Sequence, residues 1–192
     1  PFDECLIALY EEPELFDEFC EKMADYKIEC CQKIFENYGR VDGVLYHDDW
    51  GTQRAGFYSN EMFREQIMPS TSRLLKFIKD SGKFIELHSC GKNIQYVPEM
   101  LEMGIDMWTP QDMINEPDFL YETYGDKMTF CFTIHIDPKA DEAAVRAQVR
   151  DFVDHFGAKG RCMPMIGTDR SNPLQDEWAR DELYNYSLEY YN

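Results

Sequence analysis

The stretch Lys83-Phe-Ile-Glu-Leu-His-Ser-Cys-Gly91 contains a largely apolar run, Phe84 to Leu87, followed at once by residues able to carry chemistry. Such a run is typical of a buried strand, and Gly91 marks the place where the strand gives way to a loop. Because strand side chains alternate between two faces, His88 and Cys90 are expected on the same side. An imidazole nitrogen and a thiolate sulfur are two of the ligands that zinc takes in proteins.

A third candidate ligand, Cys162, lies far downstream in a second strand-like run, Gly160-Arg-Cys-Met-Pro-Met-Ile-Gly167. His-x-Cys followed by a distant Cys on another strand end is typical of a catalytic zinc site, which leaves one coordination position for a substrate. The alternative is inert packing, since cysteine is among the residues most often buried. Spacing alone leaves both interpretations open.

Composition narrows the class of protein. The 192 residues include 37 acidic and 19 basic side chains, for a formal net charge of −18, and such a field repels nucleic acid. The apolar runs are too short to cross a membrane. The seven cysteines are odd in number and have no disulfide-framework spacing, which favours a reducing compartment. We therefore expect a soluble, cytoplasmic protein with one domain over residues 1–192.

Outward from the opening stretch, helical and strand-like patterns alternate. Upstream we expect a helix over 13–38, a strand over 41–46, and a helical segment from Ser59 that Pro69 kinks or splits. Downstream, helices are expected over 94–103, 118–124 and 145–156 and from Pro173 onward, and strands over 105–109, 128–134 and 161–166.

This order is one helix followed by five strand–helix units, so the fold class is α/β with parallel strands. Both open sheets and barrels show such alternation. A complete TIM-type (β/α)8 barrel needs about 250 residues, so we expect the C-terminal five βα units of one, incomplete within this chain. An incomplete barrel leaves sheet edges exposed, which predicts self-association into a homo-oligomer.

Polar residues gather just after the expected strands, where parallel α/β folds bind ligands. The groups are His47 to Trp50, His88 to Cys90, Gln111 with Asp112, His135 to Asp137, and Cys162 with Thr168 and Asp169. Ordinary helix capping is the alternative for aspartates such as Asp137. Capping does not explain a tryptophan, a histidine and a cysteine, and we expect one shared site.

Three segments resemble the uroporphyrinogen decarboxylase superfamily, and most of all its zinc-dependent, corrinoid-linked methyltransferases. They are Asp48-Asp-Trp-Gly-Thr-Gln53, Ser59-Asn-Glu-Met-Phe-Arg-Glu-Gln-Ile-Met-Pro69 and His88-Ser-Cys-Gly91. The resemblance covers nearly the whole chain and corresponds to the last five units of that family's barrel. It implies zinc held by His88, Cys90 and Cys162, with the open position taken by a small methylated compound or a thiol. It also implies a partner corrinoid protein whose cobalt gives or takes the methyl group.

Other residues complete the predicted site. Asp112 is the favoured fourth zinc ligand, and Glu86 is the alternative. The third option is a site without a fourth protein ligand. The predicted substrate pocket consists of Tyr46, His47, Asp49, Trp50, Gln53, Trp108 and Gln111, although aromatics near strand ends are more often core. His135 is a candidate acid–base group, because an imidazole titrates near neutral pH.

The sequence leaves two rival functions open. Decarboxylation of uroporphyrinogen needs basic residues to hold many carboxylates, and the polar loops offer few. A domain that only binds a metal or a corrinoid is the non-enzymatic alternative.

Overall fold

The computed structural model describes residues 2–169 and 171–192. The chain divides into two compact units, one ending at Asn115 and the other beginning at Glu116. The expectation of one domain over residues 1–192 stays a prediction.

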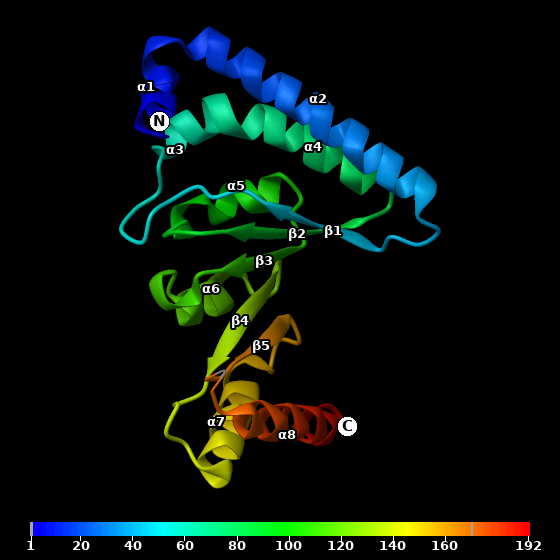
Figure 1. The fold of residues 1–192 in the computed structure, drawn as a ribbon, viewed down its shortest axis with the longest axis vertical. Coiled ribbons are helices and arrows are strands. Elements are labelled where there is room, and N and C mark those ends of the chain that lie inside the picture. Colours follow the sequence, from blue (N-terminus) through cyan, green and yellow to red (C-terminus); the bar gives the residue numbers. More distant parts are fainter. Residues whose placement is uncertain (1, 170) are drawn as a thin grey trace. The chain divides into compact units, whose positions relative to one another are not determined.

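The first unit combines three parallel strands with five helices (Figure 1). Its strands are β1 (Gly43–His47), β2 (Phe84–Ser89) and β3 (Met107–Pro110). Its helices are α1 (Phe2–Glu11), α2 (Pro13–Asn37), α3 (Asn60–Met62), α4 (Met68–Asp80) and α5 (Val97–Glu102), with the single turns η1 (Phe63–Ile67), η2 (Ile94–Tyr96) and η3 (Asp112–Ile114). The register pairs His47 with His88 and His88 with Thr109, so the three strands reach their carboxyl ends together.

Pro69 does not split the helical segment after Ser59. The Ser59 hydroxyl caps the segment by accepting a hydrogen bond from the Met62 amide. The chain then passes through a π-helical turn, η1, in which the Met68 amide donates to the Phe63 carbonyl. This wider turn lies directly before Pro69, which occupies the first turn of α4, where its missing N–H is tolerated.

The core of the first unit lies between the sheet and its helices. Ile85 and Leu87 of β2 are fully buried, as are Leu75 and Ile78 of α4. Figure 1 shows α2 and α4 running alongside each other next to the β1–β2 pair. Alternation therefore leaves Glu86 and His88 on the other face of β2, where both are only partly buried.

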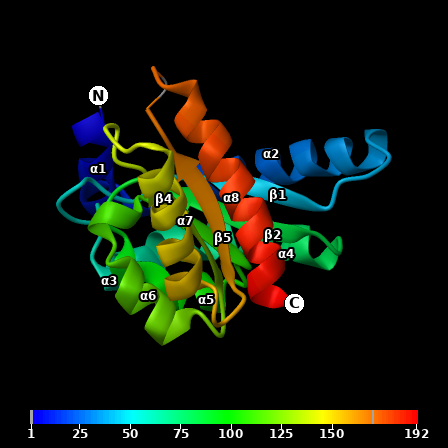
Figure 2. The same cartoon turned by 90° about the horizontal axis from the view of Figure 1, so that it is seen from below.

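The second unit has two parallel strands and three helices. They are α6 (Pro117–Tyr124), β4 (Thr129–His135), α7 (Glu142–Phe156), β5 (Cys162–Gly167) and α8 (Pro173–Tyr191). Figure 2 shows α7 and α8 next to each other and alongside the strands. Ile134 packs with Val145, Val149 and Ala179 from these helices, and Ile166 joins them.

The expected alternation of strands and helices is confirmed throughout the described chain. Helix α1 was not predicted, because its first residues offer no capping signal in the sequence. Among the described residues, no helix combines the length and the apolar character needed to cross a membrane.

Candidate metal centre

Asp49, His88 and Cys90 form a cluster at the carboxyl ends of β1 and β2. One carboxylate oxygen, one imidazole nitrogen and the thiol sulfur all lie within 4.8 Å of one another. His88 Nε2 is 3.3 Å from Cys90 Sγ, and Asp49 Oδ1 accepts a 2.8 Å hydrogen bond from the Cys90 amide. In a tetrahedral zinc site with ordinary bond lengths, nitrogen and sulfur ligands are about 3.6 Å apart. The pair therefore needs little movement to share a metal ion.

The orientation of the His88 ring is fixed from the adjacent strand. His88 Nδ1 lies 3.0 Å from the carbonyl oxygen of Thr109 on β3. Because a carbonyl oxygen only accepts, Nδ1 carries a proton, and the neutral form of the ring has its lone pair on Nε2. That lone pair is on the Cys90 side of the ring. Histidine ligands of metals are usually oriented in this way, by a hydrogen bond from the other ring nitrogen.

A close backbone crossing brings the two loops of the cluster together. Gly91 has φ +96°, and a Cβ there would lie 2.2 Å from the carbonyl carbon of Gly51. Only glycine fits at such a contact. Consequently the loop that carries Asp49 and the loop that carries Cys90 approach more closely than side chains would allow.

Three buried polar side chains hold these loops. Ser89 belongs to a polar group that the sequence pointed to, whereas Asn93 and Asn115 were not predicted. Ser89 Oγ accepts from the Trp50 amide at 3.0 Å and from Asn93 Nδ2 at 2.9 Å. Asn93 Nδ2 also donates to the Cys90 carbonyl. Asn115 Nδ2 donates to the Gly91 carbonyl at 2.9 Å, and its Oδ1 accepts from the Asn93 amide at 2.7 Å. The signal in the sequence was weak: Ser89 and Asn93 come at and just after the end of one strand, whereas Asn115 follows the next strand. Buried polar side chains need partners, and only the folded unit shows that these three are buried together.

Burial, and then the nearby Asp49 carboxylate, raise the pKa of the Cys90 thiol above its ordinary value. Without a cation the sulfur is therefore protonated at neutral pH. A bound divalent metal reverses this preference, because thiols coordinate zinc as thiolates. A carboxylate, a neutral imidazole and a thiolate form a three-ligand set that fits zinc and leaves a fourth position open.

The two candidates for a fourth ligand lie outside this cluster. Glu86 shares the face of His88 but accepts a 2.7 Å hydrogen bond from the Thr109 hydroxyl. Asp112 is buried at the start of η3, where Oδ1 accepts from the Met113 amide at 2.9 Å. Their roles as metal ligands stay predictions.

The predicted substrate pocket divides between two faces of β1. The His47 ring lies 4.8 Å from the His88 ring, and Gln53 donates to Gln111, whose oxygen also accepts from the Gly91 amide. His47, Gln53 and Gln111 therefore lie around the cluster, and Asp49 belongs to it. Three others lie elsewhere: Tyr46 and Trp50 line a cavity on the opposite side, and Trp108 is fully buried on β3. Alternation explains the division, because Tyr46 and His47 are consecutive.

The expectation that Cys162 lies at a carboxyl strand end was wrong. Cys162 is the first residue of β5 and pairs with Phe130, whereas the carboxyl end of β5 is Gly167, opposite His135. The two ends are five residue steps apart along the strand, or about 16 Å. The register Phe130–Cys162 and Ile134–Ile166 also puts Cys162 on the face that the helices cover.

The surroundings of Cys162 fit the packing alternative. Burial raises the pKa of its thiol to about 12, so the sulfur is neutral. Its role as a zinc ligand stays a prediction. His135 is exposed at the end of β4, and its acid–base role likewise stays a prediction.

Comparison with known families identifies the family of this chain. Residues 2–159 match the family "Uroporphyrinogen decarboxylase (URO-D)". The chain therefore belongs to the uroporphyrinogen decarboxylase family, as the resemblance predicted.

A solved structure has a similar fold. It is a "methyltransferase from Methanosarcina mazei", with a TM-score of 0.72 over 100% of this chain and 14% sequence identity. The chain spans 54% of that structure's length, which agrees with the predicted partial TIM-type barrel. A search of curated proteins found no match to the sequence.

Proposed function

We propose that the protein carrying this chain is a zinc-dependent methyltransferase. In this proposal, it moves a methyl group between a small methylated compound or a thiol and a corrinoid protein in the cytoplasm. The observation that carries the proposal is the cluster of Asp49, His88 and Cys90, with its ligand atoms within 4.8 Å of one another. A soft thiolate and an open position suit a sulfur ligand or an activated ether.

We assign Asp49 as the third protein ligand, in place of Cys162. Asp49 comes from the loop after β1, and its Oδ1 already contacts the Cys90 amide. A carboxylate is an ordinary zinc ligand in catalytic sites that use three protein groups. The predicted triad of His88, Cys90 and Cys162 is the competing assignment, and the cysteine variants described in the Discussion separate the two.

Each residue of the cluster has a definite task in the proposed reaction. When bound, zinc favours a thiolate over a thiol, or polarises an ether oxygen so that its methyl group leaves more easily. His88 is held in one tautomer by Thr109, so the ligand geometry is set before substrate arrives. The His47 ring is beside His88 and can take the proton that a substrate thiol releases.

Decarboxylation of uroporphyrinogen is not favoured by any contact described above. That reaction requires placement of a proton and binding of several carboxylates. A cluster containing an aspartate and a thiol offers no cationic cradle for several carboxylates.

The test is formation or loss of methyl–cobalt, followed by its visible spectrum, in the zinc-loaded protein supplied with a reduced corrinoid protein and a panel of methyl donors and thiols. We expect turnover with one class of donor or acceptor and its loss in His88→Gln. The matched control is His155→Gln, because His155 is exposed on α7 and pairs with Asp118. Rapid conversion of uroporphyrinogen by zinc-free protein would overturn the proposal.

A further inference from the structure

One acidic residue lies among apolar side chains on the sheet face that carries the metal ligand His88. Glu86 precedes His88 by two residues on β2, so both side chains lie on the face opposite α2 and α4. The strand register places Leu45 of β1 and Met107 of β3 on either side of Glu86. Phe84 comes two residues before Glu86 on the same face and is exposed, as is Leu45. The carboxylate is therefore surrounded by carbon atoms.

The adjacent strand holds the Glu86 carboxylate and the metal ligand together. Glu86 Oε1 accepts a 2.7 Å hydrogen bond from the Thr109 hydroxyl, and the carbonyl oxygen of Thr109 lies 3.0 Å from His88 Nδ1. One residue of β3 thus orients both side chains. Two residues of a strand are about 6.6 Å apart, a distance that a small molecule spans. A substrate bound at the metal centre can therefore reach Glu86.

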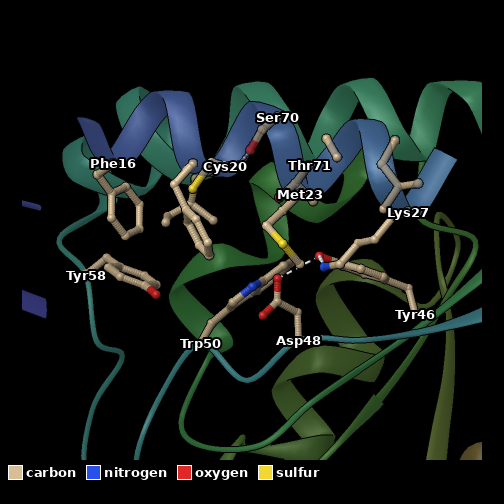
Figure 3. A pocket seen from close by; sticks show the side chains of 14 residues that line it. Phe16, Cys20, Met23, Lys27, Tyr46, Asp48, Trp50, Tyr58, Ser70 and Thr71 are labelled. Carbon is tan, nitrogen blue, oxygen red and sulfur yellow. Dashed lines mark hydrogen bonds between the residues drawn. The ribbon is translucent and has the colours of Figure 1, made fainter. Parts of the chain in front are cut away.

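The lysine nearest to this part of β1 is engaged on the opposite face. Lys27 Nζ donates to the Tyr46 hydroxyl at 3.2 Å, and that hydroxyl donates to Asp48 Oδ2 at 2.6 Å. Figure 3 shows these three side chains close together at the cavity beneath the helices. In the described part of the chain, no lysine or arginine forms an ion pair with Glu86. Its negative charge is therefore left for another partner.

The charges of the proposed metal centre favour a cationic substrate. A zinc ion held by the anions of Asp49 and Cys90 and by a neutral His88 has no net charge. Glu86 adds one negative charge beside it, in a chain whose formal net charge is −18. An anionic substrate is repelled by this arrangement, whereas a cationic one is attracted.

We infer that Glu86 determines the substrate class of the metal centre, which takes a small organic cation, such as a thiol that also carries an ammonium group, and discriminates against anions. Glu86 supplies the counter-charge, a role distinct from that of a fourth metal ligand. The apolar side chains around it contact the carbon atoms of the cation. This inference rests on the proposed metal centre and narrows its substrate class.

The test uses the cobalt(II)-loaded chain, because a thiolate bound to cobalt gives a charge-transfer absorption band that reports binding without turnover. The probes are cysteamine and 3-mercaptopropionate, in which two carbons join a thiol to an ammonium or a carboxylate group. The chain is kept at low micromolar concentration, so that contacts between copies do not cover this face. The ratio of the two dissociation constants is compared between variants, so that the different acidities of the two thiols cancel.

We expect Glu86→Gln to lower the preference for cysteamine over 3-mercaptopropionate by at least about threefold. One exposed charge pair changes affinity a few-fold, and the two probes respond to the lost charge in opposite directions. Glutamine still accepts a hydrogen bond from the Thr109 hydroxyl, so the contact with β3 is kept. Glu29→Gln is the matched control and should leave the ratio unchanged, because Glu29 is exposed on α2 and pairs with Lys33.

A second variant guards against a Glu86→Gln chain that fails to fold. Leu45 is exposed and is the register partner of Glu86, so Leu45→Lys places a cation opposite the carboxylate and should also lower the ratio. Arg54 and Lys92, in the loops after β1 and β2, are present in every variant and produce no difference between them.

The possible outcomes separate this inference from the proposed function. A cobalt-loaded chain that binds neither thiol contradicts the open position of the metal centre, and this inference with it. A chain that binds both thiols, with the same ratio in wild type and Glu86→Gln, contradicts the inference alone. Loss of cobalt itself from Glu86→Gln also overturns it, since Glu86 is then a ligand. Where Glu86→Gln does not fold, an unchanged ratio in Leu45→Lys overturns the inference.

Discussion

Asp48 and Asp49 are consecutive, yet their carboxylates serve different parts of the molecule. Asp49 Oδ1 accepts from the Cys90 amide in the metal cluster, whereas Asp48 accepts from the Tyr46 hydroxyl beside the cavity. The pair therefore provides a matched comparison. Asp49→Asn replaces an anionic ligand by a neutral amide, and Asp48→Asn makes the same change one residue away.

We predict that Asp49→Asn weakens zinc binding by at least about tenfold, since loss of a group that merely supports a ligand already costs about 10–100-fold. Asp48→Asn should leave zinc affinity within about twofold of the wild type, because Asp48 is no ligand in the proposed site. Competition with a chromophoric chelator measures both. Equal affinities for the two variants would remove Asp49 from the ligand set.

Gly91 is the residue on which the close crossing of the two loops depends. We predict that Gly91→Ala destabilises the fold by about 3 kcal/mol, from a strained positive φ together with a clash against Gly51. Gly82→Ala is the control, since Gly82 has φ +71° with nothing within 4 Å of the added Cβ. It should cost about 1 kcal/mol. Urea unfolding of both variants measures the difference, and equal losses would contradict the crossing argument.

Among the elements, helices α7 and α8 are joined by a buried carboxylate. Glu182 of α8 is 5% exposed and is paired with Arg146 and Arg150 of α7, with Arg146 Nη1 to Glu182 Oε2 at 2.9 Å. Burial alone would raise the pKa of Glu182, but hydrogen bonds from the two arginines outweigh it and lower the pKa. The ionised carboxylate therefore contributes to the stability of the folded state.

We predict that Glu182→Gln lowers the free energy of unfolding by about 1–3 kcal/mol at pH 7, the cost of a broken charged hydrogen bond. Since the folded pKa is lowered, the contribution is fully present above the ordinary glutamate pKa and disappears as the pH falls through the folded value. The gap between wild type and Glu182→Gln should accordingly close in acid. Asp181→Asn, at a more exposed partner of Arg146, is the control. A gap that does not change with pH would contradict the assignment.

The elements were largely predictable because hydrophobic periodicity marks them. The stripe Val145, Val149 and Val153 defined α7, and the apolar run before His88 defined β2. The predicted strand 161–166 already had Cys162 near its amino end, so grouping Cys162 with residues at carboxyl strand ends was inconsistent with that strand. Asn172 and Gln175 have the spacing of a capping box, which predicts reciprocal bonds at the start of α8. In the structure, Gln175 instead donates to the carbonyls of Asp137 and Ala140. That choice depends on tertiary contacts, which spacing does not encode.

Local spacing also explains why only part of the metal cluster was predicted. His88 and Cys90 share a face through local alternation, which the sequence displays directly. Asp49 joins them only because Gly51 and Gly91 let two distant loops cross. Asp49 and Cys90 are 41 residues apart along the chain, so their contact is a property of the folded unit.

At the scale of the whole molecule, apolar side chains remain exposed on the strands. Phe84 of β2 is 67% exposed and Leu45 of β1 is 52% exposed. Leu45 pairs with Glu86, so it lies on the same sheet face as Phe84. We predict that the 192-residue chain self-associates through this face, because exposed apolar strand surfaces are prone to pairing. Leu45→Glu should shift the chain toward monomer by sedimentation equilibrium. Met113→Glu, a change at an exposed residue of η3, should not. Monomeric wild-type chain at high micromolar concentration would contradict this prediction.

The zinc content of two cysteine variants tests the assignment of the metal centre most directly. Cys90→Ser and Cys162→Ser make the same change in the two competing ligand sets, and each variant is loaded with zinc, dialysed and analysed by mass spectrometry. We predict about one zinc per chain in the wild type and in Cys162→Ser, and almost none in Cys90→Ser, because an alcohol is a poor substitute for a thiolate. Loss of zinc from Cys162→Ser, or full retention by Cys90→Ser, would contradict a centre built from Asp49, His88 and Cys90.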